Sequence, residues 1–491
     1  MRWASIVSLS VLLFLSATVT GDPEEAVVGD SGVDMKRVDA AVKRGVEWLL
    51  SKQNADGSWT VTGGSQLQQI EGNYPGGSTA LALLALLKGG VSPKDARIRK
   101  GFYFCLNEAG DLPLKGAGKA PAGKQGVQMR PRTYSVSVLI LALAAKYQPR
   151  IDPKKHDEED KLKLKTTPVR EQMRKGFKRA SGRDKEAMGK LIAWLIKAQE
   201  KNVWRYPGPA QDGNREDASN TQYAMLALYT GLRLGYPIPK EVFARVADYF
   251  LQYQEKDGAD VKWFPVPGAD VPISKMRKME RNAMKALKKL AKETKGDLDK
   301  IKTDVVVDNP YKDFGDEKRK MKARGWGYIP KGKAGQYKSF ELICGSMTTS
   351  GVAAMMVCKS ALEGTGYWRK RRKAIEQAIR DGVAWLSSRF DVGTNPGKGH
   401  YHYYYLYGLE RAGVLTLTRY MGKHDWYKEG AEFLLGHQRG DGSWQEGGST
   451  GESTLVSTCF AILFLKKATA PVVRLPTTVF SGKGIFGDGK K

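Results

Sequence analysis

The sequence predicts an all-α protein in which about six helical hairpins form a double-walled ring around a central cavity. A seven-residue motif recurs near both ends of the chain, and amphipathic segments alternate with segments that are almost wholly apolar. Of the 491 residues, 41% are hydrophobic and 27% are charged. This composition supports a large packed core and excludes wholesale disorder.

The recurring motif is Gln-x-x-Asp-Gly-Ser-Trp, and we interpret it as structural. Its glycine allows a left-handed end to the preceding helix. Its aspartate can accept hydrogen bonds from turn amides, and the tryptophan can cover the glutamine. Ser58 has no histidine or other base beside it in the sequence, which argues against a catalytic role. The residues of the two copies are Gln53, Asp56, Gly57 and Trp59, and Gln438, Asp441, Gly442 and Trp444.

Each predicted hairpin pairs a helix that is apolar on one stripe with a helix that is apolar nearly all round. The first kind suits an outer layer and the second a buried inner layer. A linear solenoid is the alternative, but strong motifs in both end units, without a polar capping repeat, favour a closed ring. The predicted pairs are 42–50 with 79–87, 98–106 with 136–145, 192–199 with 220–234, 246–254 with 351–362, 375–386 with 402–409, and 431–435 with 457–465.

We expect a single ring domain over residues 38–467, with charged insertions at about 146–190 and 274–324 and a flexible tail at 471–491. Within the second insertion, residues 276–293 have the spacing of an amphipathic helix. This basic segment is either a solvated face or a contact for anionic lipid or acidic polysaccharide. The formal charge of +28 favours a polyanionic partner, but no motif indicates specific nucleic-acid recognition.

Residues 1–21 have the pattern of a signal peptide. Arg2 provides a positive start, residues 6–15 are apolar, and small residues follow at 17–21. An uncleaved membrane anchor is the alternative, although the apolar stretch is shorter than the about 20 residues that a span requires. We therefore expect an exported protein, periplasmic or extracellular, with no transmembrane segment in its mature form.

The motif pair resembles the QW motifs of squalene–hopene cyclases and the related repeats of protein prenyltransferase β-subunits, in the terpenoid cyclase superfamily. This resemblance covers roughly residues 38–467 without the insertions. The resemblance implies the α/α-toroid fold. As an exported single toroid, the chain is similar to secreted bacterial members of this superfamily. The acidic Asp-x-Asp-Asp motif of the cyclases does not occur here, and no Asp stands two residues before a Cys, as the prenyltransferase zinc site requires. We expect neither a cofactor nor a metal.

Polar and aromatic residues near the starts of the inner helices are the candidate cavity or ligand-binding residues. In a closed ring these helix N-termini share one mouth, and their dipoles give it a positive potential. Asp217 and Asn220 are also explained as helix N-caps, and the aromatic residues as core packing. The His-x-His pair at 400 and 402 lacks a third metal ligand. The candidates are Asp217, Asn220, Tyr223, Trp326, Tyr328, His402, Tyr403 and Tyr404.

Three functions remain open. The first is a toroid that lacks the family's catalytic residues and binds a small or polymeric ligand in its cavity. The second is a terpenoid or lipid cyclase with an atypical acid, which a highly apolar cavity with a buried carboxylate would favour. The third is a lyase acting on acidic polysaccharide, which needs Arg and Lys clustered inside the cavity. We favour the first, and the sequence identifies no catalytic residue.

Overall fold

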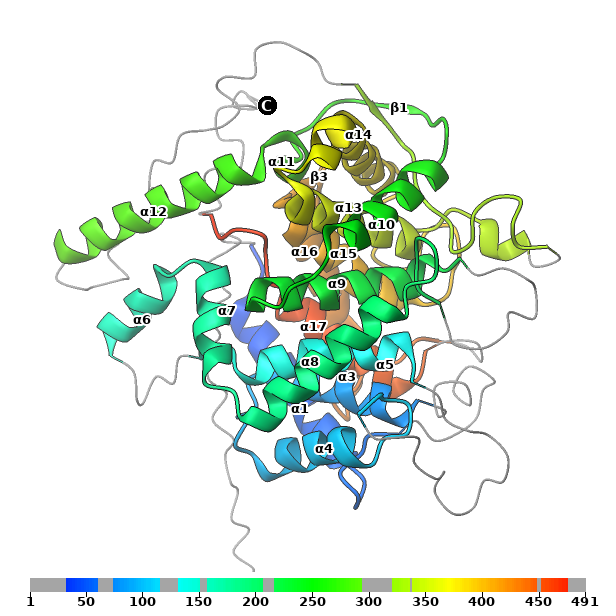
Figure 1. Ribbon diagram of the computed structural model, residues 1–491. Coiled ribbons are helices and arrows are strands. Elements are labelled where there is room, and N and C mark those ends of the chain that lie inside the picture. The colour runs from blue at the N-terminus through cyan, green and yellow to red at the C-terminus, as the bar shows by residue number, and fades with distance from the viewer. Residues whose placement is uncertain are drawn as a thin grey trace, which may run out of the picture.

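The computed structural model describes residues 32–60, 74–114, 131–150, 157–205, 216–293, 320–335, 338–447 and 452–475. The predicted all-α class is confirmed, because the strands in these ranges are only two-residue pairs (Figure 1). Strand β1 (Asp260–Val261) pairs with β2 (Met321–Lys322), and β3 (Tyr420–Met421) pairs with β4 (His424–Asp425). The predicted signal peptide and residues 476–491 lie outside the described residues.

The mostly apolar helices pack against one another in a cyclic order. Helix α3 contacts α5, α5 contacts α9, α9 contacts α13, α13 contacts α15, α15 contacts α17, and α17 contacts α3. Each is buried over most of its surface because it has such neighbours on both sides. Their bounds are α3 (Pro75–Lys88), α5 (Thr133–Lys146), α9 (Ala218–Leu234), α13 (Gly345–Leu362), α15 (His402–Thr416) and α17 (Thr454–Leu465).

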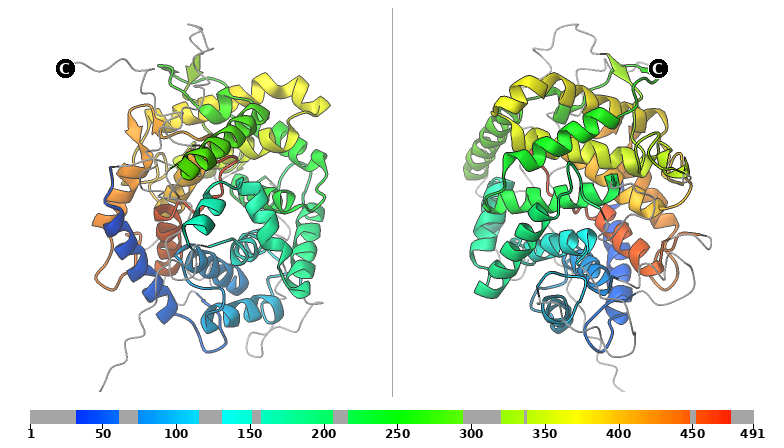
Figure 2. Two further views of the ribbon diagram at one scale, coloured as in Figure 1. Left: turned by 90° about the vertical axis from the view of Figure 1, so that its left-hand side faces the viewer. Right: turned by 45° about the vertical axis from the view of Figure 1, so that its right-hand side comes forward.

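A second set of amphipathic helices packs against this inner set (Figure 2). Helix α1 contacts α3 and α17, α4 contacts α3, and α8 contacts α5 and α9. Helices α10 and α14 contact α13, and α16 contacts α15 and α17. The bounds are α1 (Met35–Ser51), α4 (Ala96–Asn107), α8 (Gly182–Lys197), α10 (Lys240–Tyr253), α14 (Gly366–Ser388) and α16 (Trp426–Gly436).

Both copies of the Gln-x-x-Asp-Gly-Ser-Trp motif form the same turn. The indole Nε1 of Trp59 donates to the carbonyl oxygen of Leu49 at 2.7 Å, and that of Trp444 donates to Leu434 at 2.8 Å. Gly57 is left-handed at φ +94°, where a side chain would be strained. The aspartates accept the amides of the following serines at 2.9 and 3.0 Å. The motif thus ends one outer helix and buries its tryptophan.

The motif glutamine links neighbouring outer helices. Gln53 Nε2 donates to the Arg97 carbonyl of α4 at 2.9 Å. Gln438 Nε2 donates to the Ala41 carbonyl of α1 at 2.8 Å, which connects the last outer helix to the first. Gln199 makes the same kind of bond to α10, at 3.1 Å from the Val242 oxygen.

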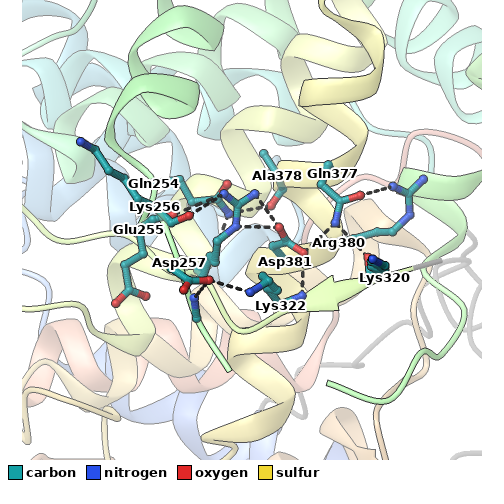
Figure 3. A network of polar contacts seen from close by, with 12 residues as sticks. Gln254, Glu255, Lys256, Asp257, Lys320, Lys322, Gln377, Ala378, Arg380 and Asp381 are labelled. Atoms are coloured by element: carbon teal, nitrogen blue, oxygen red, sulfur yellow. Dashed lines mark hydrogen bonds and ion pairs between the residues drawn. The ribbon is translucent and has the colours of Figure 1, made fainter. Parts of the chain in front are cut away.

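A polar network joins α10 to α14, where the chain returns from the second expected insertion (Figure 3). Gln254 Nε2 donates to the carbonyl oxygens of Arg324 and Ala378, both at 3.0 Å. The buried Asp381 carboxylate accepts the Arg324 Nε at 2.7 Å and the Lys322 amide at 2.9 Å. The network fixes residues 322–324 against the body of the protein.

The helix expected at 276–293 is present as α12 (Ile273–Glu293), and residues 294–319 lie outside the described residues. Its side chains Met276, Met279 and Met284 are buried. Lysines of the opposite face are exposed: Lys285, Lys288, Lys289 and Lys292. Helix α12 projects from the body beside α6 (Glu158–Lys165), which it contacts (Figure 1). Helix α7 (Val169–Lys178), from the first expected insertion, packs on α9.

Residues 468–475, which follow α17 and which we call the C-terminal strap, are almost wholly buried. Thr469 donates its amide and its hydroxyl to the Glu410 carboxylate of α15, at 2.9 and 2.6 Å. The Arg474 amide donates to Glu280 Oε1 of α12 at 2.8 Å. Residues 471–475, the start of the expected tail, are therefore buried, and Arg474 bonds them to α12. The short elements α11 (Pro267–Asp270) and η2 (Lys338–Glu341) complete the fold.

Candidate functional site

Asp217 lies at the start of α9 as its N-cap. Its Oδ1 accepts the Asn220 amide at 2.8 Å, and its Oδ2 accepts the Asn220 side chain at 2.7 Å and the Tyr328 hydroxyl at 2.6 Å. The carboxyl is buried, and burial raises its pKa above the ordinary value although these hydrogen bonds oppose the shift. The structure therefore brings Asp217, Asn220 and Tyr328 together in a closed structural cap.

Two other candidates take part in packing. Trp326 is buried and donates its Nε1 to the Phe250 carbonyl at 2.8 Å, as the motif tryptophans do. Tyr328 packs edge-on against Phe340, and the Lys398 ammonium lies 5.7 Å from the centre of the Tyr328 ring. These contacts place an aromatic ring face beside a lysine.

His402 and Tyr403 begin α15, and both are buried. The His402 Nε2 lies 2.8 Å from the Val392 carbonyl oxygen, and its ring packs on Phe433. Burial lowers the pKa of His402. Tyr403 is also buried, and this burial raises the pKa of its hydroxyl. Both side chains are thus explained by packing and local hydrogen bonding.

Tyr223 and Tyr404 meet in the interior of the inner helices, with ring centres 6.0 Å apart. The Tyr404 hydroxyl accepts a hydrogen bond from Gln222 Nε2 of α9, and the Ser219 hydroxyl of α9 is hydrogen-bonded to the hydroxyls of Tyr404 and of Tyr134 in α5. These residues lie in the first turns of α5, α9 and α15, or just beyond them. The N-terminal ends of these helices therefore converge, as the sequence predicts for parallel inner helices.

A buried arginine that the sequence did not identify fills the centre of this interior cluster. Arg411 of α15 lies over the rings of Tyr407 at 4.1 Å and Tyr223 at 5.1 Å from its Cζ. Burial opposes its charge, but the surrounding tyrosines hold the pKa of Arg411 above its usual value. Burial also raises the pKa of Tyr407, to about 12. The cluster is therefore a cation held by aromatic faces.

A cavity of about 80 Å³, counted as the space that the centres of water molecules can occupy, lies between the last turns of the inner helices. That volume holds roughly five to eight waters, or a short alkyl chain. The walls are mainly apolar, and the C-terminal strap and α7 border them. The main apolar wall residues are Leu84, Leu141, Ala144, Leu226, Met173 and Leu415.

Three basic residues interrupt the apolar wall of this cavity: Lys88, Arg233 and Arg474. Arg233 is buried in the last turn of α9, and its Nη1 donates to the Ala470 carbonyl of the strap at 3.0 Å. Its Nη2 is buried with no hydrogen-bond partner in the described part of the chain. Lys88 ends α3 and donates to the Gln148 side chain at 3.0 Å.

Sequence reasoning located the candidates at the starts of the inner helices, whereas the cavity lies at their ends. One signal was available: Lys88 and Arg233 are isolated cations that end otherwise apolar segments. Cations in the last turn of a helix are common, because they interact favourably with the helix dipole. Because this structural role is enough to explain both cations, their positions in the sequence do not by themselves indicate a ligand site.

Within the described ranges, no group of three or more His, Cys, Asp or Glu residues is arranged to hold a metal ion. Over the same ranges, no helix has both the length and the apolar character that crossing a bilayer requires. Comparison with protein families and with curated proteins finds no match to this chain.

Proposed function

We propose that the chain is an exported α/α-toroid protein that binds a small ligand with an apolar body in its central cavity. The observation that carries this proposal is the cavity between the last turns of the inner helices. The cyclic contacts of the inner helices and the Gln438 bond between the last and first outer helices support the toroid. The QW-like motifs support a relation to the squalene–hopene cyclase and prenyltransferase superfamily.

The chemistry of the interior cluster favours binding over catalysis. Its ionisable groups are tyrosines, whose pKa values burial raises, and Arg411, whose pKa is also raised. A general acid or base works best when its pKa lies near the working pH. These groups are therefore suited to holding a shape and a charge rather than to exchanging protons.

The structure has one of the features that each of the two alternative functions, a polysaccharide lyase and a lipid cyclase, would require. Basic residues line the cavity, as a polysaccharide lyase would need, but a cavity of about 80 Å³ is small for a polymer of sugar rings. The buried Glu410 would suit a lipid cyclase, but both its oxygens accept hydrogen bonds from Thr469. A small ligand satisfies the volume and the lining together.

The test is to fill the cavity with a larger side chain. Ala144 lines the cavity, whereas Ala193 is exposed on α8, so Ala144→Phe and Ala193→Phe form a matched pair. Ligand-observed NMR with 1-hexanol and with hexanoate should detect binding of at least one of the two probes to the wild-type protein and to Ala193→Phe. Ala144→Phe should lose that binding, since phenylalanine occupies the space. Undiminished binding to folded Ala144→Phe, or no binding of either probe to the wild type, would refute the cavity as the ligand site.

A further inference from the structure

The cavity has mainly apolar walls, with three basic side chains among the lining residues. Leu84, Leu141 and Leu226 form part of the apolar wall, and Arg233 stands among them with a buried guanidinium. An uncharged apolar ligand would contact the apolar walls and leave the basic side chains unused. Arg233 is therefore the residue through which the structure restricts the ligand's chemistry.

Arg233 forms no hydrogen bond with a carboxylate among the described residues, and its Cζ lies 5.4 Å from the centre of the Tyr229 ring. Its Nη1 binds a neutral carbonyl oxygen, that of Ala470, and its Nη2 is unpartnered among the described residues. A neutral amide donor could hold the strap equally well. A buried charge without a counter-ion is costly, and proteins normally pair such groups.

Two other cations that end inner helices are paired with carboxylates. Lys146 at the end of α5 lies 2.6 Å from Asp184, and Lys359 in the last turn of α13 lies 3.3 Å from Glu376. These two lysines interact favourably with the helix C-terminus, and each also has a carboxylate partner. Arg233 occupies the corresponding position on α9, yet it faces the cavity.

The charged side chains that line the cavity in the described part of the chain are all basic. Burial is the main cause that lowers the pKa of Arg233; Tyr229 and Glu280 oppose this shift, and Arg277 and Arg170 add to it. The Glu280 carboxylate attracts Arg233 but already accepts the Arg474 amide at 2.8 Å. Glu410 is likewise occupied by Thr469. An anion entering the cavity would meet excess positive charge and an available N–H donor.

We infer that the cavity ligand is an amphiphilic anion, a short alkyl chain that carries a carboxylate, and that Arg233 Nη2 binds its carboxylate. This inference rests on the proposed cavity function and names the ligand class. A charge-assisted hydrogen bond in a buried site distinguishes the anion from an alcohol of the same length. Lys88 and Arg474, which also line the cavity, add attraction for the anion.

The test compares hexanoate with 1-hexanol, which share one alkyl body, in equilibrium titrations of the full chain. Wild-type protein should bind hexanoate at least roughly tenfold more tightly, the ratio expected for one hydrogen bond to a charged group. Arg233→Met should abolish this preference while still binding 1-hexanol. Arg150→Met is the matched control, because Arg150 donates to the carbonyls of Val91 and Leu87 and its loss changes the net charge equally.

Equal wild-type affinities for hexanoate and 1-hexanol would overturn the anionic ligand and leave the cavity function standing. Failure of both probes to bind the wild type would instead count against the cavity function. Inorganic phosphate serves as a third probe, and competition by phosphate as strong as that by hexanoate would overturn the requirement for an alkyl body. The wild-type comparison decides between these outcomes even if Arg233→Met fails to fold.

Discussion

Two buried carboxylates at the N-terminal ends of the inner helices differ from one buried arginine at the C-terminal end of α9. At the N-terminal end, the Asp111 carboxylate accepts the amides of Gly76 and Gly77 at 2.9 and 3.1 Å, and also binds the Ser135 hydroxyl. Asp217 has an equally complete set of donors. At the C-terminal end, Arg233 keeps a buried N–H without a partner among the described residues.

This difference indicates where a ligand is expected. Carboxylates at helix N-termini satisfy exposed amides and are complete without a ligand. The N-terminal end is also where tyrosines and histidines gather, which made it the more conspicuous region of the sequence. An incomplete charge beside a cavity is the stronger sign of a binding site, because the folded chain alone leaves the charge uncompensated.

Asp111→Ala should give the largest effect that tests this comparison. The substitution leaves two amides and a hydroxyl without their acceptor at a buried site, so we expect a loss of about 4 kcal/mol in the free energy of unfolding. Asp95→Ala is the control, since Asp95 caps the exposed start of α4 and should cost only about 1 kcal/mol. Chemical denaturation measures both. Equal losses would mean that burial of the N-terminal cap adds nothing.

Lys359→Met and Arg233→Met compare a paired cation with an incompletely paired one. Lys359→Met should cost about 3 kcal/mol, because it leaves the buried Glu376 with a weaker set of partners. Arg233→Met should change the free energy of unfolding by less than about 1 kcal/mol. The substitution replaces an incompletely paired buried charge with an apolar side chain of similar length. Thermal unfolding of both variants without ligand measures the difference. A loss in Arg233→Met as large as that in Lys359→Met would make Arg233 a structural clamp for the strap.

The smallest effect concerns pH at the N-terminal end. Burial raises the pKa of Asp217 above its ordinary 3.8, so the folded state holds this proton more tightly than the unfolded state. The contribution of Asp217 to stability should therefore fall as pH rises from about 3.8 through the raised pKa. The melting temperature of wild type minus that of Asp217→Asn should decrease over this range, since other carboxylates cancel in the difference. A difference that increases with pH would contradict a raised pKa.

Much of the helical layout could be predicted from the chain alone. The apolar segments at 79–87 and 457–465 lie within α3 and α17, and the amphipathic segment at 276–293 lies within α12. These predictions succeed because helix periodicity is a local property of the side chains. The roles of the N-terminal candidates were harder to predict, because Asp217 depends on Tyr328, a residue more than a hundred positions away along the chain.

The amino-acid order alone determined the alternation of amphipathic and apolar helices and the turns that the Gly57 and Gly442 motifs build. Both follow from side-chain periodicity and from backbone preferences within a few residues. Only the packed structure decided which buried cations have a carboxylate partner. Lys359 and Arg233 both end apolar helices, but Glu376 reaches the lysine, whereas the strap presents only a carbonyl oxygen to the arginine. Burial and partner distance depend on segments far apart in the chain, so no local pattern distinguishes these two cations.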